Sequence, residues 1–179
     1  MTSRTSFTDE EWERLGRAPF VAAVAITLSD PGGPIEAFKE TNAALKTVVE
    51  AAQDGTHGEF VQAVARDVAE KARHRHNPLA GFKPDRARPL DDILDEMRAV
   101  NALLLAKTTP EETKQFSEWL KAAAQGAAQA AKEGGFLGIH AERVSEREQQ
   151  MLERLGEIFD GPATAEPEPA PAPEAEPPG

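Results

Sequence analysis

The chain contains no cysteine and no tyrosine among its 179 residues. The absence of cysteine excludes disulfide bonds and metal sites built from thiolate ligands. No apolar run approaches the roughly 18 residues that a membrane-spanning helix needs. The longest run, residues 18–28, has the length of a buried helix, and the N-terminal stretch MTSRTSFTDEEWERLG is acidic where a signal peptide would be basic. We therefore expect a cytoplasmic protein without membrane insertion.

Positive charge is also scarce in this chain. Its 20 lysine and arginine residues face 31 aspartate and glutamate residues, which gives a net charge of −11. Binding to nucleic acids depends on an excess of cations that neutralise phosphates, so this balance argues against a nucleic-acid partner.

Apolar residues recur at steps of three and four along most of the chain, which predicts amphipathic helices. No convincing alternation of apolar and polar residues indicates a strand. Pro19 either kinks the first helix or begins a second one, because proline lacks an amide donor. The segment PFVAAVAITL that starts there is apolar nearly all round and should be the central buried helix. The sequence thus predicts an all-α fold, a compact bundle of six or seven helices.

Four capping boxes mark expected helix starts, each a serine or threonine followed three residues later by glutamate. These pairs are Thr8–Glu11, Thr56–Glu59, Thr109–Glu112 and Ser145–Glu148. Phe7 and Trp12 occupy the positions of a hydrophobic staple around the first box. Trp12 and Trp119 both lie on apolar stripes, so we interpret them as core anchors and not as platforms for a ligand.

The composition changes after Gly161. Residues 162–179, PATAEPEPAPAPEAEPPG, contain proline, alanine and glutamate but no large apolar side chain. Such a segment cannot bury enough surface to offset its ordering entropy, so we expect a disordered tail behind a single helical domain of residues 1–161.

Two segments of the domain share one layout, which indicates a weak internal duplication. PFVAAVAITLSDPGGPIEAFKETNAAL and AAAQGAAQAAKEGGFLGIHAERVSEREQQML each pair a helix of small residues with an acid beside glycine and a helix bearing glutamate. This layout resembles the TerB-like tellurite-resistance family, whose members are small, all-helical, cytosolic and pseudo-duplicated. It also resembles uncharacterised helical proteins of actinobacterial type, through FTDEEW near the start and VSEREQQML near the end.

The resemblance implies a divalent metal, because acidic residues of TerB-like proteins are associated with metal binding. The matching acids here are Asp30, Glu36, Glu40 and Glu133. Glu36 and Glu40 are four residues apart and share a helix face, so that both could converge with Asp30 on a hard cation such as Ca²⁺ or Mg²⁺. The simpler interpretation is a solvated helix face with an acid favoured by the helix dipole. No other cofactor is indicated.

One region opposes the acidic trend of the chain. We call it the basic segment, and we expect it to bind an anion or an acidic partner. Its residues are Arg73, His74, Arg75, His76, Lys83, Arg86 and Arg88, with Lys71 just before them and only Asp85 against them. Two alternatives remain open: a solvated helix end and loop, or a surface over which the acidic tail folds back.

Catalytic motifs are absent from the sequence. It has no nucleophile elbow, no phosphate-binding glycine loop and no HExxH pair. A glutamate and a histidine that could act as a pair of metal ligands occur only once, as Glu70 and His74. His140 lies in a glycine-rich loop. We therefore expect a non-enzymatic accessory protein that binds a protein partner, with a metal or carboxylate/histidine site between helices as the alternative.

Overall fold

The computed structural model describes residues 2–29, 34–53, 57–132 and 144–160, with side chains except at 34–42 and 131–132. This part of the chain forms six α-helices and a short 3₁₀ helix, with no strand, so the all-α prediction is confirmed. The elements are η1 (Arg4–Ser6), α1 (Asp9–Ser29), α2 (Pro34–Gln53), α3 (Glu59–Arg73), α4 (Pro89–Lys107), α5 (Pro110–Lys132) and α6 (Glu146–Asp160). None of the described helices is long and apolar enough to cross a membrane.

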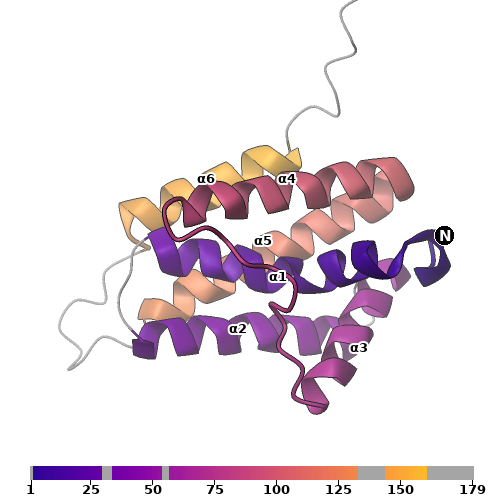
Figure 1. Ribbon diagram of the computed structural model, residues 1–179, viewed down its shortest axis with the longest axis horizontal. Helices are drawn as coiled ribbons and strands as arrows, with labels where there is room; N and C mark the ends of the chain where they lie inside the picture. Colours follow the sequence, from indigo (N-terminus) through magenta and orange to yellow (C-terminus); the bar gives the residue numbers. More distant parts are fainter. Residues whose placement is uncertain (1, 30–33, 54–56, 133–143, 161–179) are drawn as a thin grey trace, which may run out of the picture.

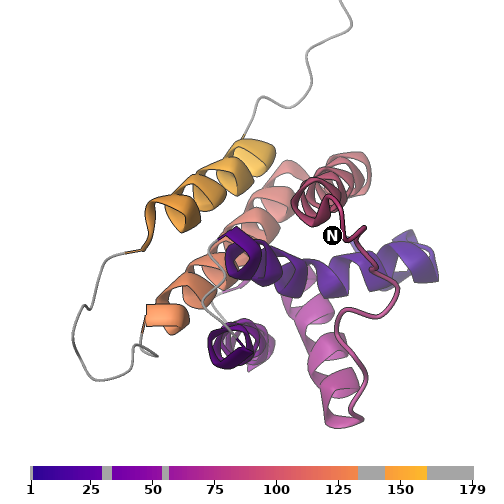
Figure 2. The ribbon, with the colours of Figure 1, turned by 60° about the vertical axis from the view of Figure 1, so that its left-hand side comes forward.

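Helices α1 and α5 form the centre of the bundle, because each of them packs against all the other α-helices. Figure 1 shows α4 and α6 together on one side of this pair and α2 and α3 on the other. Figure 2 shows that α3 crosses α1 at a steep angle. The connection between α3 and α4 runs from the far end of α3 across α1 (Figure 1).

Pro19 lies inside α1 and does not divide it. The helix continues to Ser29, and its middle is buried almost all round, from Leu15 to Ala23. Burial against α2, α4 and α5 compensates for the one backbone hydrogen bond that proline cannot make. The prediction of a central buried helix is thus confirmed, and the bundle has six α-helices in the described part of the chain.

Three of the four capping boxes are present. The hydroxyl oxygens of Thr8, Thr109 and Ser145 each accept a hydrogen bond at 3.2 Å from the backbone N–H three residues later, and the glutamates bond back. Thr56 of the fourth predicted box lies outside the described residues, and α3 begins later than that box predicts, with Gly58 as its N-cap and Glu59 as its first residue. Phe60, the second residue of α3, is 2% exposed and packs against Phe116.

Helix α3 ends at Arg73. His74 already leaves helical geometry with a ψ of 13°, and Arg75 takes a left-handed φ of 58°. The residues from His74 onward therefore belong to the connection that leads to α4.

Five aromatic rings, from three helices and the residue that follows η1, form a continuous cluster at the end of the bundle where the chain begins. Neighbouring ring centroids lie between 5.2 and 6.3 Å apart. We call this cluster the aromatic end: Phe7, Trp12, Phe60, Phe116 and Trp119. The prediction that both tryptophans are core anchors is confirmed, since Trp12 is 3% exposed and Trp119 1% exposed.

Several predictions fall outside the described residues. They concern the stretches with an acid beside glycine in the two similar segments, residues 30–33 and 133–135, and the tail at 162–179. The internal duplication, whose defining glycines lie there, and the domain boundary at residue 161 therefore stay predictions.

Candidate functional site

The basic segment is exposed along its whole length. All seven of its members are exposed, from the last residue of α3 through the connection to the residue before α4. Arg73 and His74 both contact Glu70, at 2.8 Å and 3.2 Å, and Arg88 lies 3.5 Å from Asp92. These contacts join exposed groups in a high dielectric, so they hold the charges only weakly.

The remaining cations of the basic segment are less constrained. Arg75, Lys83 and Arg86 form no ion pair with any residue that the structure describes. Their charge therefore stays available to an incoming anion.

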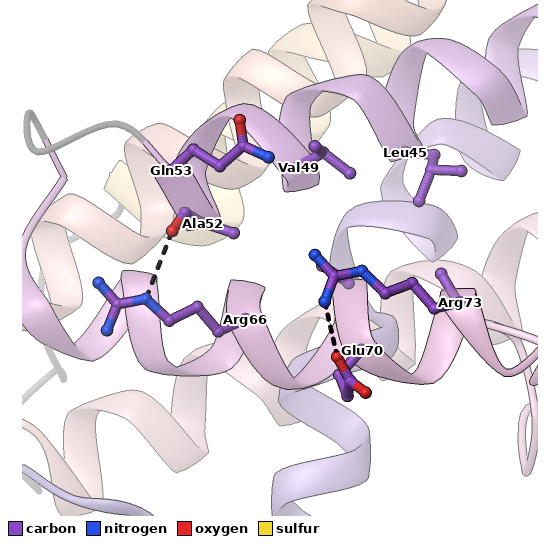
Figure 3. A pocket seen from close by; sticks show the side chains of 9 residues that line it. Leu45, Val49, Ala52, Gln53, Arg66, Glu70 and Arg73 are labelled. Carbon is purple, nitrogen blue, oxygen red and sulfur yellow. Dashed lines mark hydrogen bonds and ion pairs between the residues drawn. The ribbon is translucent and has the colours of Figure 1, made fainter.

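A groove lies next to this segment, between α2 and α3. Its volume is about 600 Å³, and its lining combines small and aliphatic side chains with two arginines. The residues that line this α2–α3 groove are Leu45, Val49, Ala52, Gln53, Arg66, Ala69, Glu70, Ala72 and Arg73. Figure 3 shows the aliphatic side chains on α2 opposite the guanidinium groups of Arg66 and Arg73 on α3.

Arg66 is held at the edge of the groove by the end of α2. Its Nε donates a hydrogen bond of 3.3 Å to the backbone oxygen of Ala52, and its Nη2 donates to Gln62 at 2.5 Å. Carbonyl groups in the last turn of a helix lack partners and carry partial negative charge, so this position favours a cation. The contact orders the arginine while leaving it exposed beside the apolar floor.

A second hollow, the α1–α3 cavity, lies beside the groove and has a volume of about 370 Å³. Leu45 and Ala72 line both hollows. The buried residues Gly16, Phe20 and Val68 contribute to its lining, and Pro78 and Ala80 of the α3–α4 connection line its outer side. A Cβ added to Gly16 would lie 3.0 Å from Cγ2 of Val68, so glycine permits the close approach of α1 and α3 here.

Ion pairs surround the α1–α3 cavity. Arg17 is 7% exposed; its Nε donates to Glu96 Oε1 at 2.9 Å, and its Nη2 lies 2.7 Å from the same oxygen in an ion pair. Arg14 reaches the same oxygen at 3.2 Å. A buried charge that lost its partner would be strongly destabilising, so this network holds α1 to α4.

Lys71 forms the second part of this network. It contacts Glu13 on α1, and its Nζ lies 2.8 Å from Asp67 Oδ2 on α3. Partial burial lowers the pKa of Lys71, but hydrogen bonds and Coulomb attraction from Asp67 and Glu13 outweigh that effect and raise it above its ordinary value. Lys71 therefore stays charged and bridges α1 and α3.

The predicted metal ligands cannot be placed. Asp30 and Glu133 lie outside the described residues, and the side chains of Glu36 and Glu40 on α2 are not described. Within the described residues, no three histidine or acidic side chains group to hold a metal ion. Two acidic residues in the first half of α4, which could also be considered as metal ligands, form contacts within the protein. Asp92 accepts a hydrogen bond from the backbone N–H of Asp85, and Glu96 accepts one from Arg17.

Sequence reasoning identified the basic segment but missed the neighbouring apolar surface. Arg66 and Arg73 are seven residues apart, so helical periodicity places them on one face of α3 together with Ala69. That signal was available in the sequence. In contrast, no sequence signal indicates that Arg17 lines the neighbouring cavity.

Comparison of the chain with protein-family models, with curated proteins and with solved structures finds no match. The candidate site is therefore interpreted from its own geometry.

Proposed function

We propose that the protein is a non-enzymatic binding module, and that its α2–α3 groove takes an amphipathic helix of a protein partner that carries acidic residues beside its apolar stripe. The observation that supports this most directly is the groove itself, a hollow of about 600 Å³ with an aliphatic floor and arginines on one side. A groove between two helices suits the apolar face of a third, which inserts side chains at steps of three and four residues.

Charge determines which helices suit the groove. Arg66 and Arg73 line it against a single acid, Glu70, and the cations of the basic segment continue beyond it. On a chain of net charge −11 this is an unusual positive surface, so it steers an acidic partner and repels a basic one. We expect the affinity to fall as salt rises, because the cations are exposed.

The ion pairs of three glutamates in the described part of the chain favour a binding module over an enzyme. Glu11, Glu13 and Glu96 each pair with a cation from another helix, and such pairs connect elements of the fold. The resemblance to TerB-like proteins would make the module an accessory protein of a metal or stress response in the cytoplasm. That assignment, with or without a bound divalent metal, belongs to the proposal.

The proposal is tested by capturing partners from the source organism at low and moderate salt. Two groove variants are compared with the parent: Val49→Asp, which places a charge on the apolar floor, and Arg66→Glu/Arg73→Glu, which reverses the charge of the α3 side. Leu105→Asp is the matched control, because Leu105 is an exposed apolar residue on α4 and is not among the groove residues.

We expect the parent and Leu105→Asp to retain the same partner, and both groove variants to lose it by about tenfold or more, as when an apolar anchor or a central charge pair is removed from an interface. Circular dichroism confirms that the variants fold. The double arginine variant changes only exposed residues, so it keeps the test valid should Val49→Asp unfold. Partners that bind both groove variants as tightly as the parent would refute the proposal.

A further inference from the structure

The α1–α3 cavity has the composition of a small-molecule site. Its volume of about 370 Å³ falls within the range of ~300–1,000 Å³ usual for ligand pockets. The lining is apolar over Phe20, Leu45, Val68 and Ala72. Its polar and charged members are Glu13, Arg17, Lys71, His76 and Asn77. Such pockets bind the body of a ligand by burial and orient it through the few polar groups.

The buried arginine of the lining keeps a hydrogen-bond donor that the described residues do not use. Arg17 directs Nε and Nη2 to Glu96, whereas its third nitrogen, Nη1, has no hydrogen-bond partner among the described residues. This nitrogen lies against the α3–α4 connection, because a Cβ added to Gly81 would approach it to 3.3 Å. Gly81 also takes a left-handed φ of 82°, so glycine serves both the turn and the contact there. A donor on a side chain that is 7% exposed favours an acceptor that reaches it through the cavity.

The ion-paired charges of the cavity lining already have partners within the protein. The cations Arg14, Arg17 and Lys71 are joined by ion pairs to the carboxylates of Glu13, Asp67 and Glu96. A charged ligand that entered between these pairs would lose its hydration without an unpaired countercharge from them, whereas a neutral ligand would not bear this cost.

We propose that the α1–α3 cavity binds a neutral small molecule with an apolar body and a carbonyl-type hydrogen-bond acceptor, which accepts from Nη1 of Arg17. The body lies against Phe20 and Val68 and is covered by the α3–α4 connection at Pro78 and Ala80. This site does not depend on the function proposed for the α2–α3 groove, although Leu45 and Ala72 border both.

Three probes of one shape separate the chemistries: 4-butylbenzamide is neutral, 4-butylbenzoate is an anion and 4-butylbenzylamine is a cation. Each is titrated into the full chain, and binding is followed by the backbone amide resonances of Gly16, Val68 and Ala80. We expect the amide to bind about tenfold more tightly than the amine and severalfold more tightly than the benzoate, in line with the cost of burying an uncompensated charge. Equal affinities, a tighter benzoate, or no shift at these amides up to the solubility limit would overturn the proposal.

Two sets of variants locate the site. Ala80→Trp places a large ring at the exposed mouth of the cavity and should weaken the amide by about tenfold or more, whereas Ala102→Trp, at an exposed alanine of α4 outside the lining, should not. Arg17→Met/Glu96→Met removes the donor together with its partner, so the buried guanidinium is not left without a countercharge. Arg14, which also contacts Glu96, has a side chain that is 29% exposed and stays in reach of solvent. Circular dichroism shows whether this variant folds, and the amide should then lose its advantage over the benzoate. An amide that binds Ala80→Trp as tightly as the parent would place the ligand elsewhere.

Discussion

The aromatic end and the α2–α3 groove both include residues of α3, yet only the aromatic end is filled by side chains. Near its start α3 carries Phe60, whose ring lies 5.6 Å from that of Phe116 and 5.7 Å from that of Phe7. Near its end the same helix presents Ala69 and Ala72 toward α2, and a hollow of about 600 Å³ remains. Side-chain size along one helix therefore decides where the bundle is packed and where it stays open to a partner.

Polar contacts follow the same division. At the aromatic end Lys107 lies 2.7 Å from Glu11, and Glu112 accepts from the hydroxyl of Thr2 at 2.6 Å. These contacts join residues about a hundred positions apart in the chain. At the α2–α3 groove the ion pair of Arg73 is with Glu70 on its own helix, and one exposed hydrogen bond, from Arg66 to the backbone oxygen of Ala52, reaches α2. The first kind of contact holds elements together, while the second can be exchanged for a contact with another molecule.

The largest expected effect on stability comes from a substitution at the aromatic end. Phe60→Ala removes a ring that is 2% exposed and contacts three other rings. We expect the free energy of unfolding to fall by about 3–5 kcal/mol, as for large-to-small changes in cores. Chemical denaturation measures it. Leu45→Ala, on the half-buried side of the groove, is the counterpart and should cost less than about 2 kcal/mol. Equal losses would show that the two regions are packed alike.

The next effect concerns the close approach of α1 and α3. Gly16→Ala adds a methyl group 3.0 Å from Cγ2 of Val68, which is nearer than ordinary van der Waals contact. We expect a loss of about 1–3 kcal/mol in the free energy of unfolding, the usual range for overpacking. Val68→Ala removes the opposing methyl groups, so the double variant should lose less than the sum of the two single variants. Additive losses would contradict this contact.

A smaller effect concerns the cap of α5 at the aromatic end. Thr109→Ala removes the hydroxyl that accepts from the N–H of Glu112 at 3.2 Å. The loss of an N-cap should reduce the free energy of unfolding by about 1 kcal/mol, as measured by thermal and chemical denaturation at neutral pH.

The same cap should make stability depend on pH. Partial burial raises the pKa of Glu112, but hydrogen bonds from Thr2 and Thr109 outweigh it and lower the pKa to about 2, from an ordinary value of 4.5. A depressed pKa contributes stability above the ordinary value, and this contribution is lost as the pH falls through about 2. Denaturation of the parent and of Glu112→Gln across this acidic range measures it. The variant should show the weaker dependence on pH, and equal curves would exclude Glu112 as the source.

The smallest effect on stability is expected at the α2–α3 groove. Arg73→Gln removes the charge of a side chain that is 72% exposed. We expect a change below about 0.5 kcal/mol in the free energy of unfolding, as for most exposed ion pairs. Binding of the acidic partner should weaken nevertheless. A large loss of stability would mean that this arginine belongs to the fold and not to the binding surface.

The sequence by itself determined the helices, since spacing and caps depend on neighbours within a few residues. The boxes at Thr8, Thr109 and Ser145, the buried run after Pro19 and the core positions of Trp12 and Trp119 all follow from such local patterns. The exposed basic segment was predictable for the same reason, because charges cluster along the chain there.

Only the tertiary structure decided how α3 begins and what lies beside its end. The N-cap of α3 is Gly58, and Phe60 just after it packs against Phe116 of α5. The pairing of Arg17 with Glu96 joins residues 79 positions apart. The groove and the cavity depend on how α3 crosses α1 and α2, which the periodicity of one helix does not contain. Packing between distant segments is a sum of contacts over the whole bundle, so a hollow left by small side chains emerges only when the helices are assembled.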